Sequence, residues 1–130
     1  MKRIVPAILI AAALLAAAAH AQKREEQSPC ADAQTQAELN VCAGRKFKEA
    51  DAELNRVYNQ LTSKVDSMYR AKLKAAEVSW LKYRDDNCDY ETALYEGGSM
   101  RPMVYSFCLE RMTKARAAEL RAQIKELDEQ

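Results

Sequence analysis

The chain has very few residues that turn a polypeptide, and this scarcity limits the folds open to it. Of its 130 residues only three are Gly, and Pro102 is the only Pro after Pro29. Because Gly and Pro are the strongest turn signals, long stretches without them favour a few long helices. The clearest turn lies at residues 96–99. We therefore expect an all-α fold, either a small irregular helical bundle or a long antiparallel helical hairpin.

Apolar residues recur every three or four positions in four stretches, which is the spacing of one helix face. A capping box of Thr35 and Glu38 begins a short helix that we expect to end at Gly44. A second helix follows to about Val65, and Asp66 begins a third. The predicted apolar faces of the third and fourth helices comprise Tyr69, Leu73, Ala76, Trp80, Tyr83 and Asn87, and Met103, Phe107, Met112, Ala115, Leu120, Ile124 and Leu127.

The four cysteines are expected to form two disulfides. Cys88 lies ten residues before Gly98, and Cys108 lies ten residues after it. An antiparallel hairpin that turns at Gly98 therefore places these two cysteines at the same height on facing helices. Cys30 and Cys42 remain as the second pair. Zinc is the alternative, but no two cysteines have the close spacing of a zinc knuckle.

Residues 1–21 have the features of a signal peptide: two basic residues, an apolar run and a final small-x-small pattern. We expect cleavage after Ala21, a polar lead-in at 22–29 and a helical domain at 30–130. Cleavage would leave a periplasmic or secreted chain without a membrane segment. A retained anchor is the alternative, but the apolar run is short for a span of about 20 residues.

Cleavage would also remove the only histidine, His20. Without an imidazole the mature chain has no Ser-His or Cys-His nucleophile, so we expect no enzyme, no metal and no cofactor. It keeps 18 Lys and Arg against 19 Asp and Glu. A near-neutral chain is a poor partner for nucleic acid. A hydrolase that uses Asp86 and Asp89 is the alternative, but the sequence shows no sign of a pocket around them.

The end of the third helix is strongly acidic, because residues 85–96 include five Asp or Glu and no Lys or Arg. The backbone dipole already makes a helix C-terminus negative, so acidic groups there are mildly destabilising. A local rule that is broken without structural gain often marks function. The candidate partner-binding residues are Asp85, Asp86, Asp89, Glu91, Glu96, Gly97, Gly98 and Ser99. The alternatives are a solvated acidic face and a plain turn in which Ser99 caps the fourth helix.

A second group of residues is expected to be structural: Trp80, Tyr83, Arg84, Asp51, Asn55 and Arg116. The two aromatic residues lie on the helix stripe and should pack in the core. We expect Arg84 to be a buried anchor that bonds a helix-end carbonyl or pairs with Asp51. Asp51 and Asn55 should share a hydrogen bond on one helix face. For Arg116 we expect an ion pair, with partner binding as the alternative.

Many of these residues form one ordered set. It comprises Cys30, Gln36, Glu38, Asn40, Cys42, Ala50-Asp51, Leu54-Asn55, Tyr58, Trp80, Tyr83-Arg84-Asp85, Cys88, Gly97-Gly98-Ser99, Cys108, Thr113, Arg116 and Leu120. With this set the chain resembles the LprI-like lysozyme-inhibitor family over most of its mature length. Glu77 departs from the family pattern, which usually has Gln three positions before the Trp.

The resemblance implies a small exported helical domain of the bacterial envelope that inhibits lysozyme, or a related peptidoglycan hydrolase, by direct contact. An acidic helix end would steer a basic lysozyme into encounter. Fold and function separate easily, so two alternatives stay open. One is an immunity protein against a bacterial cell-wall hydrolase, and the other is an envelope interaction or assembly module. The sequence leaves the oligomeric state open.

Overall fold

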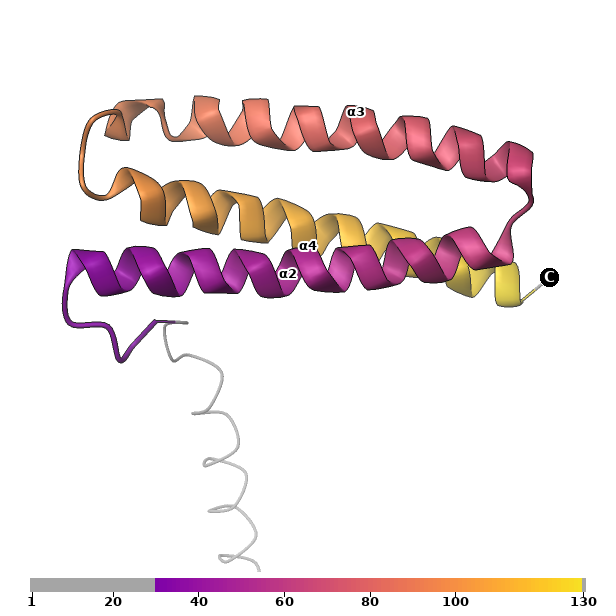
Figure 1. Cartoon of the computed structure of the whole chain (residues 1–130), viewed down its shortest axis with the longest axis horizontal. Coiled ribbons are helices and arrows are strands. Elements are labelled where there is room, and N and C mark those ends of the chain that lie inside the picture. Colours follow the sequence, from indigo (N-terminus) through magenta and orange to yellow (C-terminus); the bar gives the residue numbers. More distant parts are fainter. Residues whose placement is uncertain (1–29, 130) are drawn as a thin grey trace, which may run out of the picture. The chain divides into compact units, whose positions relative to one another are not determined.

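Three long helices dominate the computed structural model, which describes residues 30–129 (Figure 1). The elements in order are α2 (Gln36–Lys64), α3 (Ser67–Glu91), the 3-10 helix η2 (Ala93–Tyr95) and α4 (Arg101–Asp128). Helices α2 and α4 run in the same direction, and α3 runs antiparallel to both. No strand occurs within the described residues, and the predicted all-α class is confirmed. The predicted signal peptide and lead-in lie outside these residues.

The four cysteines form two disulfides, Cys30–Cys42 and Cys88–Cys108, so the predicted pairing is confirmed. In the second bond the sulfur atoms are 2.04 Å apart and the Cα atoms 5.7 Å apart. This bond joins α3 to α4 within the unit that begins at Asp32 and contains all three helices.

Helix α2 is one continuous helix, so the predicted break at Gly44 is wrong. Its start is as predicted: the Thr35 hydroxyl accepts from the Glu38 amide, and the Glu38 carboxylate accepts from the Thr35 amide. A Gly inside a helix costs about 1 kcal/mol relative to Ala. Burial outweighs that cost, because the same helix face buries Cys42 and Ala43 before Gly44 and continues beyond it.

The hydrophobic core lies between α2 and α4, which share most of the contacts between helices. Its buried residues are Leu54, Val57, Leu61, Ala117, Leu120 and Ile124. The predicted face of α4 is therefore partly right, because Leu120 and Ile124 are buried while Ala115 and Leu127 are exposed. Two helices with one shared apolar seam thus carry most of the hydrophobic stabilisation.

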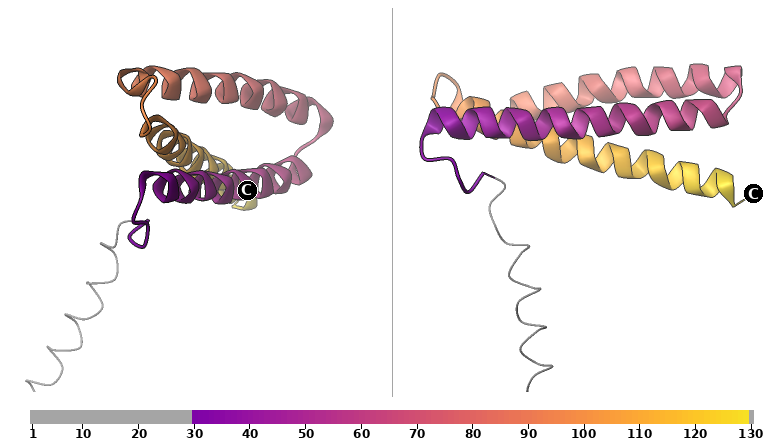
Figure 2. Two further views of the ribbon diagram at one scale, coloured as in Figure 1. Left: turned by 60° about the vertical axis from the view of Figure 1, so that its left-hand side comes forward. Right: turned by 60° about the horizontal axis from the view of Figure 1, so that its bottom comes forward.

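Helix α3 adds little to this core, as Figures 1 and 2 show by its distance from most of the α2–α4 pair. It begins at the predicted cap, Asp66, whose carboxylate accepts from the Tyr69 amide. Only Arg84 and Cys88 are buried in its 25 residues. Trp80 is half-buried, but the prediction that Tyr83 packs in the core is wrong, because its side chain is 60% exposed. Helices α2 and α4 pack on each other, so α3 contacts them along a narrow line.

Arg84 is the polar anchor of that line. Its guanidinium pairs with Asp85 at 2.8 Å and with Asp51 of α2 at 3.8 Å, and it donates to the Thr113 hydroxyl of α4 at 3.3 Å. It also lies over the ring of Phe47 at 5.3 Å. The predicted pair with Asp51 therefore forms, and one buried cation connects three helices.

The turn between α3 and α4 forms where it was predicted. Gly97 has a φ of 74°, a left-handed conformation that strongly favours Gly. The Gly98 amide donates to the Tyr95 carbonyl at 2.9 Å. Ser99 does not cap α4: the cap residue is Met100, which makes no side-chain capping bond.

Candidate protein-binding surface

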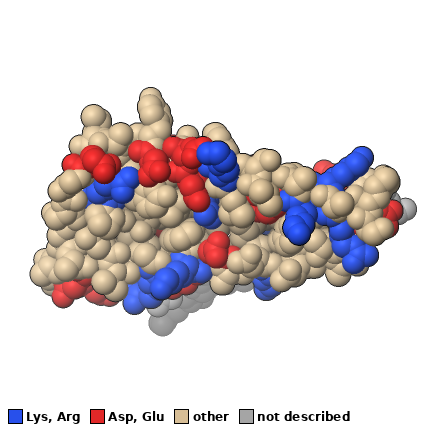
Figure 3. Space-filling model, turned by 45° about the horizontal axis from the view of Figure 1, so that its top comes forward, with Lys and Arg blue, Asp and Glu red and all other residues tan. Residues whose placement is uncertain are grey.

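All eight predicted partner-binding residues lie at one end of the helical unit, which we call the apex (residues 85–100). The last two turns of α3 carry Asp85, Asp86, Asp89 and Glu91, and the turn to α4 carries Glu96 and the three small residues after it. On the face drawn in Figure 3, acidic side chains gather over the apex half, while basic side chains predominate at the opposite end. The structure therefore brings these residues together at the end of the hairpin that α3 and α4 form.

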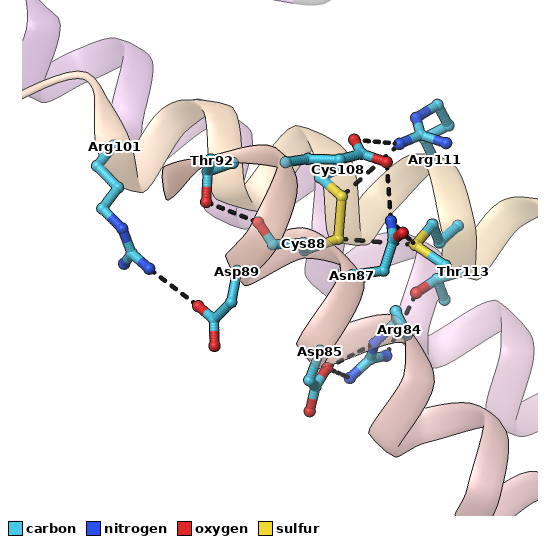
Figure 4. Close-up of a disulfide and its surroundings, with 12 residues drawn as sticks. Arg84, Asp85, Asn87, Cys88, Asp89, Thr92, Arg101, Cys108, Arg111 and Thr113 are labelled. Atoms are coloured by element: carbon cyan, nitrogen blue, oxygen red, sulfur yellow. Dashed lines mark hydrogen bonds and ion pairs between the residues drawn. A yellow bond between two sulfur atoms is a disulfide. The ribbon is translucent and has the colours of Figure 1, made fainter. Parts of the chain in front are cut away.

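The apex is braced from inside (Figure 4). The Cys88–Cys108 bond fixes α3 to α4 one turn before α3 ends. The hydroxyl of Thr92, a buried residue, donates to the Cys88 carbonyl at 2.6 Å. From α2, the Asn40 amide donates to the Ser99 carbonyl at 3.1 Å. These bonds hold the apex in one shape, which reduces the ordering cost of binding a partner.

Each acidic side chain of the apex has a cationic partner. The expectation that these acidic residues bring no structural benefit is therefore wrong. Distances between the paired atoms are 2.8 Å for Asp85–Arg84, 2.6 Å for Asp86–Lys82, 2.9 Å for Asp89–Arg101, 3.0 Å for Glu96–Arg101 and 2.7 Å for Glu91–Arg111. Three of these pairs use cations from α4, which the hairpin brings beside α3. The ion pairs offset the unfavourable dipole interaction of the acids.

The carboxylates nevertheless face solvent, because their side chains remain between 41% and 74% exposed. Hydrogen bonds from Asn87 and then from Arg111 lower the pKa of Glu91. A lowered pKa keeps this group charged at neutral and mildly acidic pH. The apex is thus a set of exposed, internally paired charges and not a free negative patch.

Sequence reasoning missed the exposed apolar side chains of the apex. Leu94 is 97% exposed and Tyr90 is 81% exposed, and Tyr95 and Met100 are also exposed. The signal in the sequence was the short apolar run Ala93-Leu94-Tyr95, which stands one residue before the Gly pair, where a turn and not a long helix was expected. Exposed aromatic and aliphatic groups with a charged rim are typical of protein-binding surfaces.

The remaining predicted structural residues make the contacts expected of them. The Asn55 amide donates to the Asp51 carboxylate at 3.2 Å. Arg116 of α4 pairs with Glu77 of α3 at 3.0 Å and with Glu119 at 2.9 Å. The residue that departs from the family pattern, Glu77, therefore supplies a further polar link between α3 and α4.

Neither a metal cluster nor a membrane span is found where the structure describes the chain. Between residues 30 and 129 no three His, Cys, Asp or Glu side chains are grouped so that they could hold a metal ion. The described helices also lack an apolar stretch long enough to cross a bilayer.

The family described as "Lysozyme inhibitor LprI" matches residues 18–120 of this chain. The chain belongs to the LprI family. Within this LprI chain the match covers α2, α3 and the whole apex, together with α4 up to Leu120.

A relative of similar length supports the assignment. An uncharacterized protein of Rhizobium meliloti (strain 1021) is 36% identical over 134 aligned positions, which cover 93% of the LprI chain and 94% of that protein. No solved structure matches the chain.

Proposed function

We propose that this LprI-family chain is an exported, non-enzymatic protein that inhibits lysozyme, or another peptidoglycan-cleaving hydrolase, by direct contact through its apex. The observation that carries the proposal is the apex itself, where exposed Tyr90 and Leu94 stand among charged side chains on a disulfide-braced hairpin. Membership of a lysozyme-inhibitor family supports an enzyme partner.

The apex has the properties that a contact with a basic enzyme requires. Its five carboxylates project into solvent and pair with four cations, Lys82, Arg84, Arg101 and Arg111. The net negative charge that remains would attract a cationic protein over distances near the Debye length, which raises the association rate. Leu94 and Tyr90 would then supply the apolar area that holds the complex together. Because the hairpin is pre-ordered, little conformational entropy is lost on binding.

The two disulfides support export, since such bonds persist in oxidising compartments. A periplasmic or secreted location would place the protein where peptidoglycan hydrolases act. The proposal needs no cofactor and no nucleic acid.

The test measures clearance of a bacterial cell-wall suspension by lysozyme in the presence of the mature chain. We expect dose-dependent inhibition that weakens as salt rises, because ion screening slows the encounter. Leu94→Asp should weaken inhibition by about tenfold or more, since it removes a central apolar contact. Met68→Asp is the matched control, because Met68 is also exposed but lies at the other end of α3.

Absence of inhibition at any stoichiometry would reject lysozyme as the target. Inhibition of a bacterial cell-wall hydrolase that spares common lysozymes would instead identify an immunity protein. An envelope assembly module would bind structural envelope proteins with Leu94→Asp unchanged, and that result would overturn the role of the apex.

A further inference from the structure

We propose that two copies of this chain associate through their α3 helices in antiparallel orientation. The feature that points to this is a column of exposed side chains along α3, at Tyr69, Ala76, Tyr83 and Tyr90, each seven positions after the one before. Side chains at this spacing fall on one side of a helix and form the seam of helix–helix contacts. This inference goes beyond the proposed function.

The column is not used by the chain itself. Tyr69 is 56% exposed, Ala76 is exposed, and the exposures of Tyr83 and Tyr90 are higher still. The parallel column of Leu73, Trp80 and Asn87 is half-buried towards α2 and α4. The heptad-like pattern of α3 therefore has one line of residues facing its own chain and one line facing outwards.

The charges of α3 favour a second copy of the chain as the partner that packs on this exposed column. The first half of the helix carries Arg70, Lys72 and Lys74, and none of them has an ion pair among the residues that the structure describes. The last two turns, residues 85–91, carry only acidic charges. This order is the reverse of what the helix dipole favours. Two such helices attract each other when they are antiparallel and repel when they are parallel.

Two charged residues beside the column give the complementarity a specific form. Lys72 follows Tyr69 by three positions and precedes Ala76 by four, while Asp86 stands in the same relation to Tyr83 and Tyr90. Both are exposed. In an antiparallel pair with a two-fold axis, Lys72 of each copy would face Asp86 of the other, so the contact would form twice.

The surface also has room for a partner. Ala76 and Ser79 are small and exposed at the centre of the column, which allows another helix to approach closely. Beside its basic end lies a groove of about 530 Å³ between α3 and α4, with Tyr69, Leu73 and Leu127 in its lining. In the antiparallel arrangement, Tyr90 of the second copy would reach this groove, so that in the dimer Leu94 would remain as the exposed apolar contact of the apex for an enzyme. Such a dimer would display its two apices in opposite directions.

The experiment measures self-association of the mature chain by sedimentation equilibrium over a wide concentration range and in the absence of any enzyme. We expect a reversible dimer in the micromolar range, because one helix pair buries less surface than a standard stable interface. Tyr83→Arg should weaken association by about tenfold or more, whereas Val78→Arg should leave it within about twofold. Val78 is exposed to the same 60% on the same helix but off the column.

The orientation is tested with two single charge reversals, Lys72→Asp and Asp86→Lys. Each variant alone should dimerise more weakly, because it places like charges across both contacts. An equimolar mixture of the two should recover association, since every contact in the mixed dimer again joins opposite charges. Recovery also excludes misfolding of either variant. A monomer at all concentrations, or a mixture no tighter than its components, would overturn the proposal and leave the proposed function untouched.

Discussion

The guanidinium carbon of Arg84 lies 5.5 Å from the centre of the Trp80 ring, one turn before it on the same helix. Arg116 of α4 lies over the same ring at 5.8 Å. Trp80 is therefore attracted by two cations that are themselves paired with carboxylates. Cation–ring and ionic contacts thus add to the packing of Leu73 and Trp80 against the core in joining α3 to its neighbours.

Replacing Arg84 should test this attachment directly. We expect Arg84→Ala to lower the free energy of unfolding by about 2 kcal/mol, because it removes the ring contacts and the bond to Thr113. The free energy of unfolding of Arg84→Lys should lie between those of the parent and of Arg84→Ala, since Lys keeps the charge but loses the planar guanidinium. Urea unfolding followed by circular dichroism measures both, with exposed Arg70→Ala as a control that should stay within about 0.5 kcal/mol of the parent.

Removing the Cys88–Cys108 bond should have a larger effect than removing any single apex side chain. The bond closes a loop with a sequence separation of 20, for which chain entropy predicts about 3 kcal/mol of stabilisation. We expect the Cys88→Ser/Cys108→Ser variant to lose this amount in urea unfolding. Hydrogen exchange should show faster exchange of the amides near Thr92. Equal stability of the two proteins would contradict the bracing role.

Two glycines should respond in opposite ways to the same substitution. Gly97→Ala should destabilise by about 1–2 kcal/mol, because its φ of 74° places a Cβ in conflict with the backbone. Gly44→Ala should stabilise by about 0.5–1 kcal/mol, because Gly44 lies inside α2 and an added Cβ meets nothing within 4 Å. Thermal unfolding of the two variants measures how far each shifts the midpoint temperature from that of the parent. Shifts of the same sign and size would contradict the backbone geometry assigned to the two glycines.

Acid should weaken the link between α2 and α4. Hydrogen bonds from Arg56 and Arg121 lower the pKa of Glu53 from 4.5 to about 2. A carboxyl whose pKa falls on folding stabilises the protein above its unfolded pKa, and that contribution is lost as the pH drops from about 4.5 towards 2. We expect Glu53→Gln to flatten the pH dependence of the unfolding midpoint in this window. Because 35% of the Glu53 side chain is accessible to solvent, salt should reduce the effect.

The accuracy of the sequence predictions depended on whether the determining contact was local. The helix starts at Thr35 and Asp66, and the turn at Gly97, follow from a few neighbouring residues and formed as expected. The break at Gly44 did not form, because burial of the α2 face against α4 outweighs a local penalty. Tertiary packing is not visible in one segment of sequence.

The candidate site shows the same division. Symmetric spacing about the Gly pair was sufficient to predict which cysteines bond. The partners of the acidic residues were missed, because Arg101 and Arg111 lie beyond the turn and reach Asp89 and Glu91 only after the hairpin closes. Periodicity identified the stripe of α3, but it did not reveal that only half of that stripe faces the chain.

The shallow seating of α3 affects how this protein can diverge. Only two of its 25 residues are buried, so most of its positions tolerate replacement without loss of the α2–α4 core. Surface substitutions away from buried contacts typically change stability by less than about 0.5 kcal/mol. A descendant sequence can therefore alter the outward face of this helix, and with it the choice of partner, while the remainder of the scaffold stays the same.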